Sequence, residues 1–196
     1  MLSSVSMTAA ATLVDPRLVR GLKRSEYDKL AELGAFDDER VELLYGMVVA
    51  MNPKGPPHEG TLQCLNRLIS HAFYDHAEVR IAAPFAASDG SEPEPDVAVV
   101  PPGKYTQEHP HEAYLVVEVS QSSLAMDLGT KARLYAECGV PEYWVVNLEG
   151  ERVDVHTEVV RGAYARVTPY GRGEAIALPR LASVTVRVDD ILPPTR

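Results

Sequence analysis

The sequence of 196 residues predicts a single mixed α/β domain, and three observations support this. The runs "DVAVV" (96–100) and "YLVVEV" (114–119) are short, apolar and β-branched, which is typical of strands buried on both faces. Apolar residues recur at helical spacing between His58 and about His76. After Gly150, alternating segments predict strands with one solvent face. Strands and helices mixed in this way indicate an α/β architecture.

The elements follow in order along the chain. The predicted helices cover 25–34, 58–76 and 126–139, and glycines end the first and the last of them. Two strands meet near Gly46 within 40–51, and further strands are expected at 78–88, 96–100, 114–119 and 141–147. The C-terminal strands are 152–160, 164–170 and 183–188. Residues 1–20 are expected to form a flexible tail, and residues 21–196 the single domain.

The composition limits the function classes. With 45% hydrophobic and 24% charged residues, the chain has ordinary globular composition. Its formal net charge of -9 argues against tight non-specific DNA binding, although a local basic cleft remains compatible with it. Cys64 and Cys138 form neither a metal-spaced pair nor a disulfide framework. Because no signal peptide or membrane-length apolar run is visible, a reducing cytoplasm is the expected location.

Two carboxylates stand where the strand pattern calls for apolar residues. Asp96 opens one core strand, and Glu118 lies inside the next. A buried carboxylate without a partner is costly to ionise, and two brought together repel each other. If the two strands are neighbours in one sheet, a hard divalent cation such as Mg²⁺ or Mn²⁺ offsets both charges. The alternatives are that Asp96 caps a turn and that Glu118 pairs with a core arginine.

Glu42 and Lys131 extend this set. Glu42 lies inside "VELLYG", and Lys131 lies in the helix that follows Glu118. A lysine near metal-held acids can stabilise anionic charge or orient a water, as phosphodiester hydrolysis requires. Two alternatives stay open: Glu42 on the solvent face of an edge strand, and Lys131 in a solvated i,i+4 pair with Asp127.

The motifs resemble a known nuclease superfamily. "PD" at Pro95–Asp96 followed by Glu118 on a hydrophobic strand resembles the PD-(D/E)xK nucleases. The longer run from Tyr114 to Asn147, with "GVPEYW" entering its last strand, is similar to the Uma-type family of restriction-endonuclease-like proteins. The resemblance covers roughly residues 26–155. It implies a restriction-endonuclease-like mixed central sheet flanked by helices, with additional strands at both ends.

The chain departs from the superfamily pattern at Ser120, which stands where the acid-x-lysine motif has its lysine. The resemblance implies that Lys131, on the following helix, takes this role. It also implies that Asp96, Glu118 and Glu42 hold Mg²⁺ or Mn²⁺, that a main-chain carbonyl after Glu118 contributes, and that the protein is a homodimer.

Other polar residues are better explained structurally. His58, at the start of a helix, is interpreted as a helix cap rather than a metal or water ligand. His109 and His111 lie in a polar loop, and we expect them to be solvated. Tyr135 and Trp144 are expected in the core rather than as stacking platforms for bases.

The leading function hypothesis is a Mg²⁺-dependent endonuclease that hydrolyses DNA, with Glu42, Asp96, Glu118 and Lys131 as catalytic residues. A nuclease-fold binding module without useful catalysis is one alternative, suggested by the negative net charge and by Ser120. A metal-dependent hydrolase of RNA or of another phosphodiester is the other.

Overall fold

The computed structural model describes Asp15 and residues 18–194. Its centre is a mixed sheet of six strands, in the spatial order β3-β4-β5-β6-β7-β8. β5 and β6 are parallel, and the other neighbours in this sheet are antiparallel. The strands are β3 (Glu78–Ile81), β4 (Val97–Val100), β5 (Leu115–Ser120), β6 (Tyr143–Asn147), β7 (Arg152–Val160) and β8 (Ala163–Gly171).

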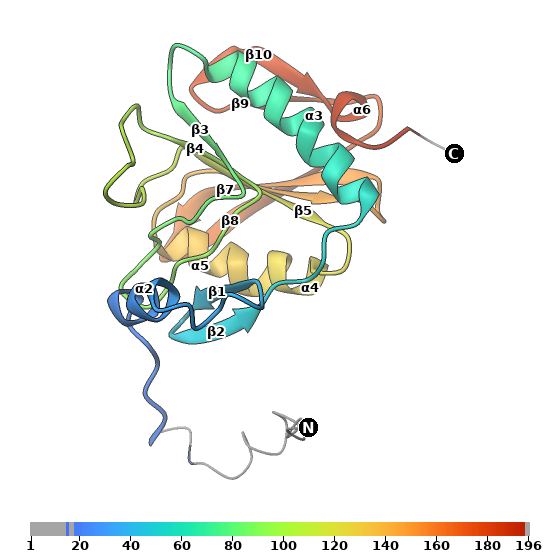
Figure 1. The fold of residues 1–196 in the computed structure, drawn as a ribbon. Helices are drawn as coiled ribbons and strands as arrows, with labels where there is room; N and C mark the ends of the chain where they lie inside the picture. The colour runs from blue at the N-terminus through green and yellow to red at the C-terminus, as the bar shows by residue number, and fades with distance from the viewer. Residues whose placement is uncertain (1–14, 16–17, 195–196) are drawn as a thin grey trace.

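Helices cover both faces of this sheet (Figure 1). On one face lies α3 (Pro56–Phe73), together with the hairpin of β9 (Ala175–Leu178) and β10 (Leu181–Arg187) and the short α6 (Val188–Ile191). On the other face a helix runs through three segments, α4 (Leu124–Met126), the π-helical η2 (Asp127–Lys131) and α5 (Ala132–Glu137).

The N-terminal elements lie beside this second helix (Figure 1). They are α2 (Arg24–Glu32) and the hairpin of β1 (Val41–Leu44) and β2 (Met47–Ala50). Gly46 turns this hairpin with a φ of 79°, and a Cβ there would come within 2.7 Å of the Gly21 Cα. A left-handed conformation and a close backbone approach both favour glycine at this position.

The strand alternation assigns each core residue to a face. Leu115, Val117 and Val119 of β5 pack on the α3 side, whereas Val116 packs on the α5 side. Because successive strand residues point to opposite faces, Glu118 shares the α5 side with Val116.

The structure confirms the mixed sheet with flanking helices and corrects details of the predicted elements. The strand expected over 78–88 ends at Ile81, before Pro84, which cannot donate to a sheet ladder. The helix expected from His58 begins at Pro56, because prolines are tolerated in the first helical turn. β9 and α6 were not predicted. Most of the predicted tail, 1–20, lies outside the described residues.

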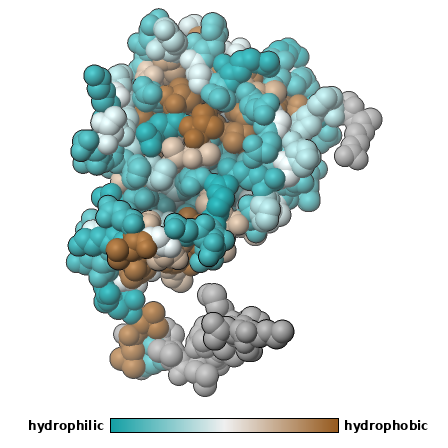
Figure 2. Space-filling view, in the orientation of Figure 1, coloured by the Kyte–Doolittle hydropathy of each residue, from teal (hydrophilic) through white to brown (hydrophobic). Residues whose placement is uncertain are grey.

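Within the described residues, the structure contains no helix long and apolar enough to span a membrane. Hydrophilic residues cover most of the face in Figure 2, and the apolar residues there form small separate groups.

Candidate functional site

The register of β4 and β5 brings the two predicted acids together. Val97 pairs with Val117 and Ala98 with Val116, so extending the register by one residue sets Asp96 opposite Glu118. Residues opposite each other in an antiparallel pair project on the same face. The Val119 amide also donates a hydrogen bond of 2.8 Å to Asp96 Oδ2, which ties the carboxylate to β5. The expectation of neighbouring strands is therefore confirmed.

Lys131 reaches Glu118 from the helix on the same face. Its Nζ lies 3.0 Å from Glu118 Oε1, and the hydroxyl of Tyr135 donates to that same oxygen at 2.9 Å. Lys131 is the last residue of the π-helical turn, which has a wider backbone than an α-helix and is frequent at functional sites. The alternative of a solvated Lys131 is wrong, because this side chain is only 7% exposed.

Glu42 completes this ion-pair cluster from the N-terminal hairpin. Its Oε1 lies 3.0 Å from the Nζ of Lys131, and its Oε2 accepts a hydrogen bond of 3.1 Å from the Glu94 amide. The main chain of Leu43 also bonds in both directions with Glu92, just before β4. Glu42 is 4% exposed, so the alternative of a solvent-facing Glu42 is wrong.

Asp96 has a different set of partners, which come from the segment between β2 and α3. Lys54 Nζ lies 2.8 Å from Asp96 Oδ1, and His58 Nε2 lies 3.1 Å from Oδ2. The N-cap of α3 is Gly55, so the interpretation of His58 as the helix cap is wrong. His58 is held instead against the acid, on the first turn of the helix.

Ser120, at the expected lysine position, has a structural partner. Its hydroxyl donates a short hydrogen bond to Asp127 Oδ2, and Ser123 donates to the same oxygen at 2.6 Å. The main-chain carbonyl of Asp127 accepts a hydrogen bond from the hydroxyl of Tyr143. These contacts fix the start of the π-helical turn and so the direction from which Lys131 enters.

These side chains line a cavity of about 510 Å³. Among the described residues on its walls are two lysines and five carboxylates, which are Glu42, Glu94, Asp96, Glu118 and Asp127. Such an excess of negative charge attracts cations and repels a bare phosphodiester. An anionic substrate could approach these walls only together with a cation that offsets their charge.

Burial and charge shift the acids in opposite directions. Burial raises the pKa of Glu118 to about 8, Lys131 opposes the rise, and the charge of Asp96 adds to it. Burial would also raise the pKa of Asp96, but its hydrogen bond with His58 and the charges of His58 and Lys54 lower it overall. Burial alone would lower the pKa of Lys131, yet Glu118 and Glu42 raise it. Lys131 is therefore positively charged at neutral pH.

The oxygen donors of this cavity fit a hard divalent cation. Mg²⁺ is usually held by one or two carboxylates and keeps several waters, so Asp96 and Glu118 form a sufficient donor set. Within the described residues no group of three or more His, Cys, Asp or Glu side chains is arranged to hold a metal.

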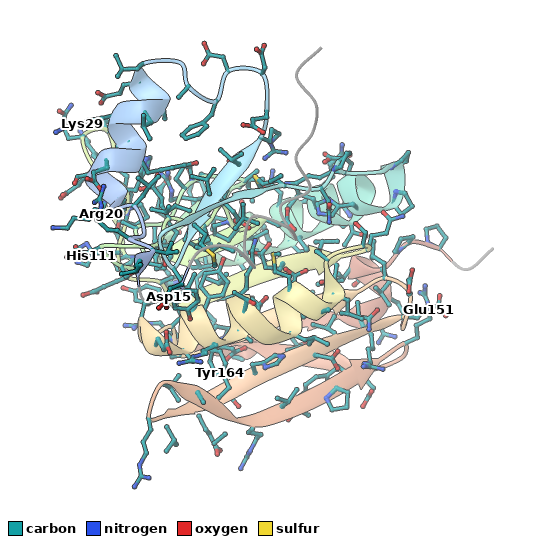
Figure 3. All side chains as sticks on the ribbon, turned by 90° about the horizontal axis from the view of Figure 1, so that it is seen from below. Asp15, Arg20, Lys29, His111, Glu151 and Tyr164 are labelled. Atoms are coloured by element: carbon teal, nitrogen blue, oxygen red, sulfur yellow. The ribbon has the colours of Figure 1, made fainter. Side chains whose placement is uncertain are left out.

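The remaining predicted positions lie elsewhere. His111 is exposed at the periphery of the molecule (Figure 3). His109 is half-buried, and burial lowers its pKa. Neither residue lines the cavity of Asp96 and Glu118. Tyr135 and Trp144 are fully buried, as expected of core residues, although the Tyr135 hydroxyl also donates a hydrogen bond to Glu118.

Sequence reasoning missed Lys54 as a site residue. It lies between Pro53 and Gly55, in a loop whose composition predicts only a turn. No periodicity constrains such a loop, so its approach to Asp96 emerges only from the tertiary structure. The nearby His58, which the sequence places at the start of the following helix, was the available signal.

Comparison with known proteins supports the same fold. A crystal structure described as "a putative nuclease belonging to DUF820" from Anabaena variabilis is similar to this chain with a TM-score of 0.64. The two share 14% sequence identity, and the match covers 79% of this chain and 90% of that one. None of the curated proteins matches the chain. The family model of Uma2, described as "Putative restriction endonuclease", matches residues 24–189. The chain therefore belongs to the Uma2 family of restriction-endonuclease-like proteins.

Proposed function

We propose that this protein is a metal-dependent endonuclease that hydrolyses phosphodiester bonds in DNA. The observation that carries the proposal is the convergence of three side chains on one acidic cavity: Asp96, just before β4, Glu118 in the adjacent β5, and Lys131 in the following helix. Membership of a nuclease-like family and the likeness to a nuclease fold support it.

Asp96 and Glu118 would hold Mg²⁺ or Mn²⁺, together with the main-chain carbonyl after Glu118 and waters. When bound, such an ion polarises the phosphate and lowers the pKa of a bound water from about 15.7 toward neutrality. Glu42 lies 3.0 Å from the ammonium of Lys131 and lines the same cavity, so it would orient that ammonium and serve as an additional acid that coordinates the metal or a water.

Lys131 supplies the fixed positive charge. Its ammonium is held between Glu42 and Glu118 at 3.0 Å from each, so it is oriented before a substrate arrives. A preorganised cation stabilises the charge that develops on a pentacovalent phosphate, or it orients the attacking water. This is the role that the acid-x-lysine motif gives to a lysine at the position of Ser120.

A nicking assay tests the proposal. Wild-type protein with supercoiled plasmid and Mg²⁺ or Mn²⁺ should produce nicked circles, and EDTA should abolish the reaction. Asp96→Ala and Glu118→Ala should each be inactive, whereas Asp75→Ala, at an exposed acid, should retain full activity. The proposal fails if wild-type protein does not nick DNA or if both site variants still do. Parallel assays with RNA separate the two substrate classes.

A binding module that keeps the fold without catalysis is the second candidate. One observation favours it: Lys54 and Lys131 already lie against Asp96 and Glu118, so the protein can neutralise these acids without a metal. Calorimetric titration with Mn²⁺ at neutral pH and low salt separates the two candidates, because an inert module gives no binding heat. The homodimer stays a prediction, which analytical ultracentrifugation checks.

A further inference from the structure

Lys54 is placed where a cation bound to Asp96 would lie. It comes from the loop that joins β2 to α3 (Figure 1), and it lines the same cavity as Asp127 and Lys131. Its Nζ lies 2.8 Å from Asp96 Oδ1, and its side chain is only 14% exposed. This contact therefore occurs inside the cavity and not on the open surface.

The two oxygens of Asp96 have different partners. Oδ2 is engaged by the Val119 amide at 2.8 Å and by His58 Nε2 at 3.1 Å. Both partners belong to fixed elements, since Val119 lies in β5 and His58 in α3. Oδ1 is bound by Lys54, whose long stem comes from a loop. The oxygen that can change its partner most easily is Oδ1.

The two lysines of the cavity also differ in how firmly they are held. Lys131 is anchored by two carboxylates, Glu42 and Glu118, and sits on a helix. Among the described residues, Lys54 has one carboxylate partner, Asp96, and it lies on a loop. A divalent cation that uses Asp96 would compete with the ammonium of Lys54 for Oδ1, whereas Lys131 can stay in place.

We propose that Lys54 is an exchangeable counter-ion of Asp96, which a divalent cation must displace in order to bind. This inference rests on the metal site of the proposed function. In the metal-free protein the ammonium offsets the charge of a buried carboxylate and so limits its cost. Metal binding breaks that ion pair and leaves an additional positive charge in the cavity. Lys54 thereby weakens metal affinity and sets the concentration at which the site fills.

Calorimetric titration with Mn²⁺ tests this inference. Wild-type protein, Lys54→Met and Lys104→Met are stripped with EDTA, dialysed and titrated under identical conditions. Lys104 is exposed and lies outside the cavity, so its variant controls for the loss of one positive charge. We expect Lys54→Met to bind Mn²⁺ about tenfold more tightly than wild type, which corresponds to about 1.4 kcal/mol. The control should bind like wild type.

Thermal unfolding gives a second readout that a merely structural lysine would not produce. Lys54→Met should melt below wild type in EDTA, and saturating Mn²⁺ should raise its Tm by more than it raises that of wild type. A structural lysine would lower the Tm equally in both conditions and leave the Mn²⁺ affinity unchanged. If Lys54→Met does not fold, Lys54→Gln, which is neutral but keeps a donor, is titrated in its place.

The outcomes separate this inference from the proposed function. If wild type binds Mn²⁺, Asp96→Asn does not, and the Lys54 variant binds with wild-type or weaker affinity, the counter-ion role is overturned while the metal site stands. If neither wild type nor the Lys54 variant binds Mn²⁺, the metal site and the counter-ion role are both overturned.

Discussion

Replacement of Lys131 by methionine tests the ion-pair cluster most severely. The change removes an ammonium that lies 3.0 Å from both Glu42 and Glu118, while it keeps a side chain of similar length. Both carboxylates are 4% exposed, so they cannot replace the lost partner by full hydration. The variant therefore holds two buried acids without the cation that they share.

The expected loss of stability follows from this burial. Removing one partner of a buried ion pair lowers the free energy of unfolding by about 3–5 kcal/mol. Because water can enter the cavity, we expect a loss at the lower end of this range, about 3 kcal/mol. For a chain of this length, that corresponds to a fall in Tm of roughly 6–12 °C. Lys29→Met, at an exposed position of α2, is the matched control and should shift the Tm by less than about 2 °C.

The loss should also depend on pH in a defined direction. Burial already raises the pKa of Glu118 to about 8, and removal of Lys131 raises it further. Below about pH 7 both folded proteins hold this proton, so their stabilities fall in parallel as pH rises. Above about pH 8 wild type releases the proton and the variant keeps it, so only the stability of the variant continues to fall. The difference from wild type should consequently be smaller at pH 6 than at pH 9.

Thermal or urea unfolding of wild type, Lys131→Met, the Lys29→Met control and the double variant Lys131→Met/Glu118→Gln at both pH values measures these effects. The double variant should recover at least half of the loss at pH 9, because it removes the charge that lacks a partner. A loss below about 1 kcal/mol, equal losses at both pH values, or no recovery in the double variant would refute the reasoning.

Three further changes have defined outcomes. Tyr135→Phe removes a donor to Glu118 and should cost about 1 kcal/mol in urea unfolding; no change would mean that the bond does not form. Ser120→Ala leaves Asp127 with Ser123 as its remaining hydroxyl donor and should cost about 1–2 kcal/mol, and a smaller cost would contradict the short hydrogen bond. Burial raises the pKa of Glu92 to about 7. The free energy of unfolding of wild type should therefore fall between pH 5 and pH 8 by about 1–2 kcal/mol more than that of Glu92→Gln. Parallel pH profiles of the two proteins would exclude this pKa shift.

The acids could be predicted from the sequence because a carboxylate stands out in an apolar strand. Glu118 interrupts a run of valines, and the β4–β5 register then determines that Asp96 lies opposite it. Both facts follow from local pattern and strand pairing. Lys131 was inferred from the resemblance, and its contact with Glu118 was found only in the structure.

Residues of loops and helix ends were harder to predict. The approach of Lys54 and His58 to Asp96 depends on how the loop before α3 packs against the sheet, and no local periodicity encodes this. The π-helical turn also has no local sequence signature. It becomes understandable only when Asp127 is seen to bind Ser120 while Lys131 reaches the acids.

In the C-terminal region, too, the sequence pattern predicted the elements but not how they pair. β7 and β8 were predicted as strands, but the pattern alone did not indicate that they extend the central sheet beyond β6. Because β8 joins this sheet, its Tyr164 lies between α5 and the sheet and donates a hydrogen bond to the Val140 carbonyl (Figure 3). Strand pairing of this kind depends on contacts distant in sequence.

The most direct test of the central claim is a crystal of this protein soaked in Mn²⁺ and measured at a wavelength where manganese scatters anomalously. We expect an anomalous peak between the carboxylates of Asp96 and Glu118, with the Lys131 ammonium still within hydrogen-bond distance of Glu118. A fully soaked crystal without a peak in this cavity, or with a peak that avoids both carboxylates, would contradict it.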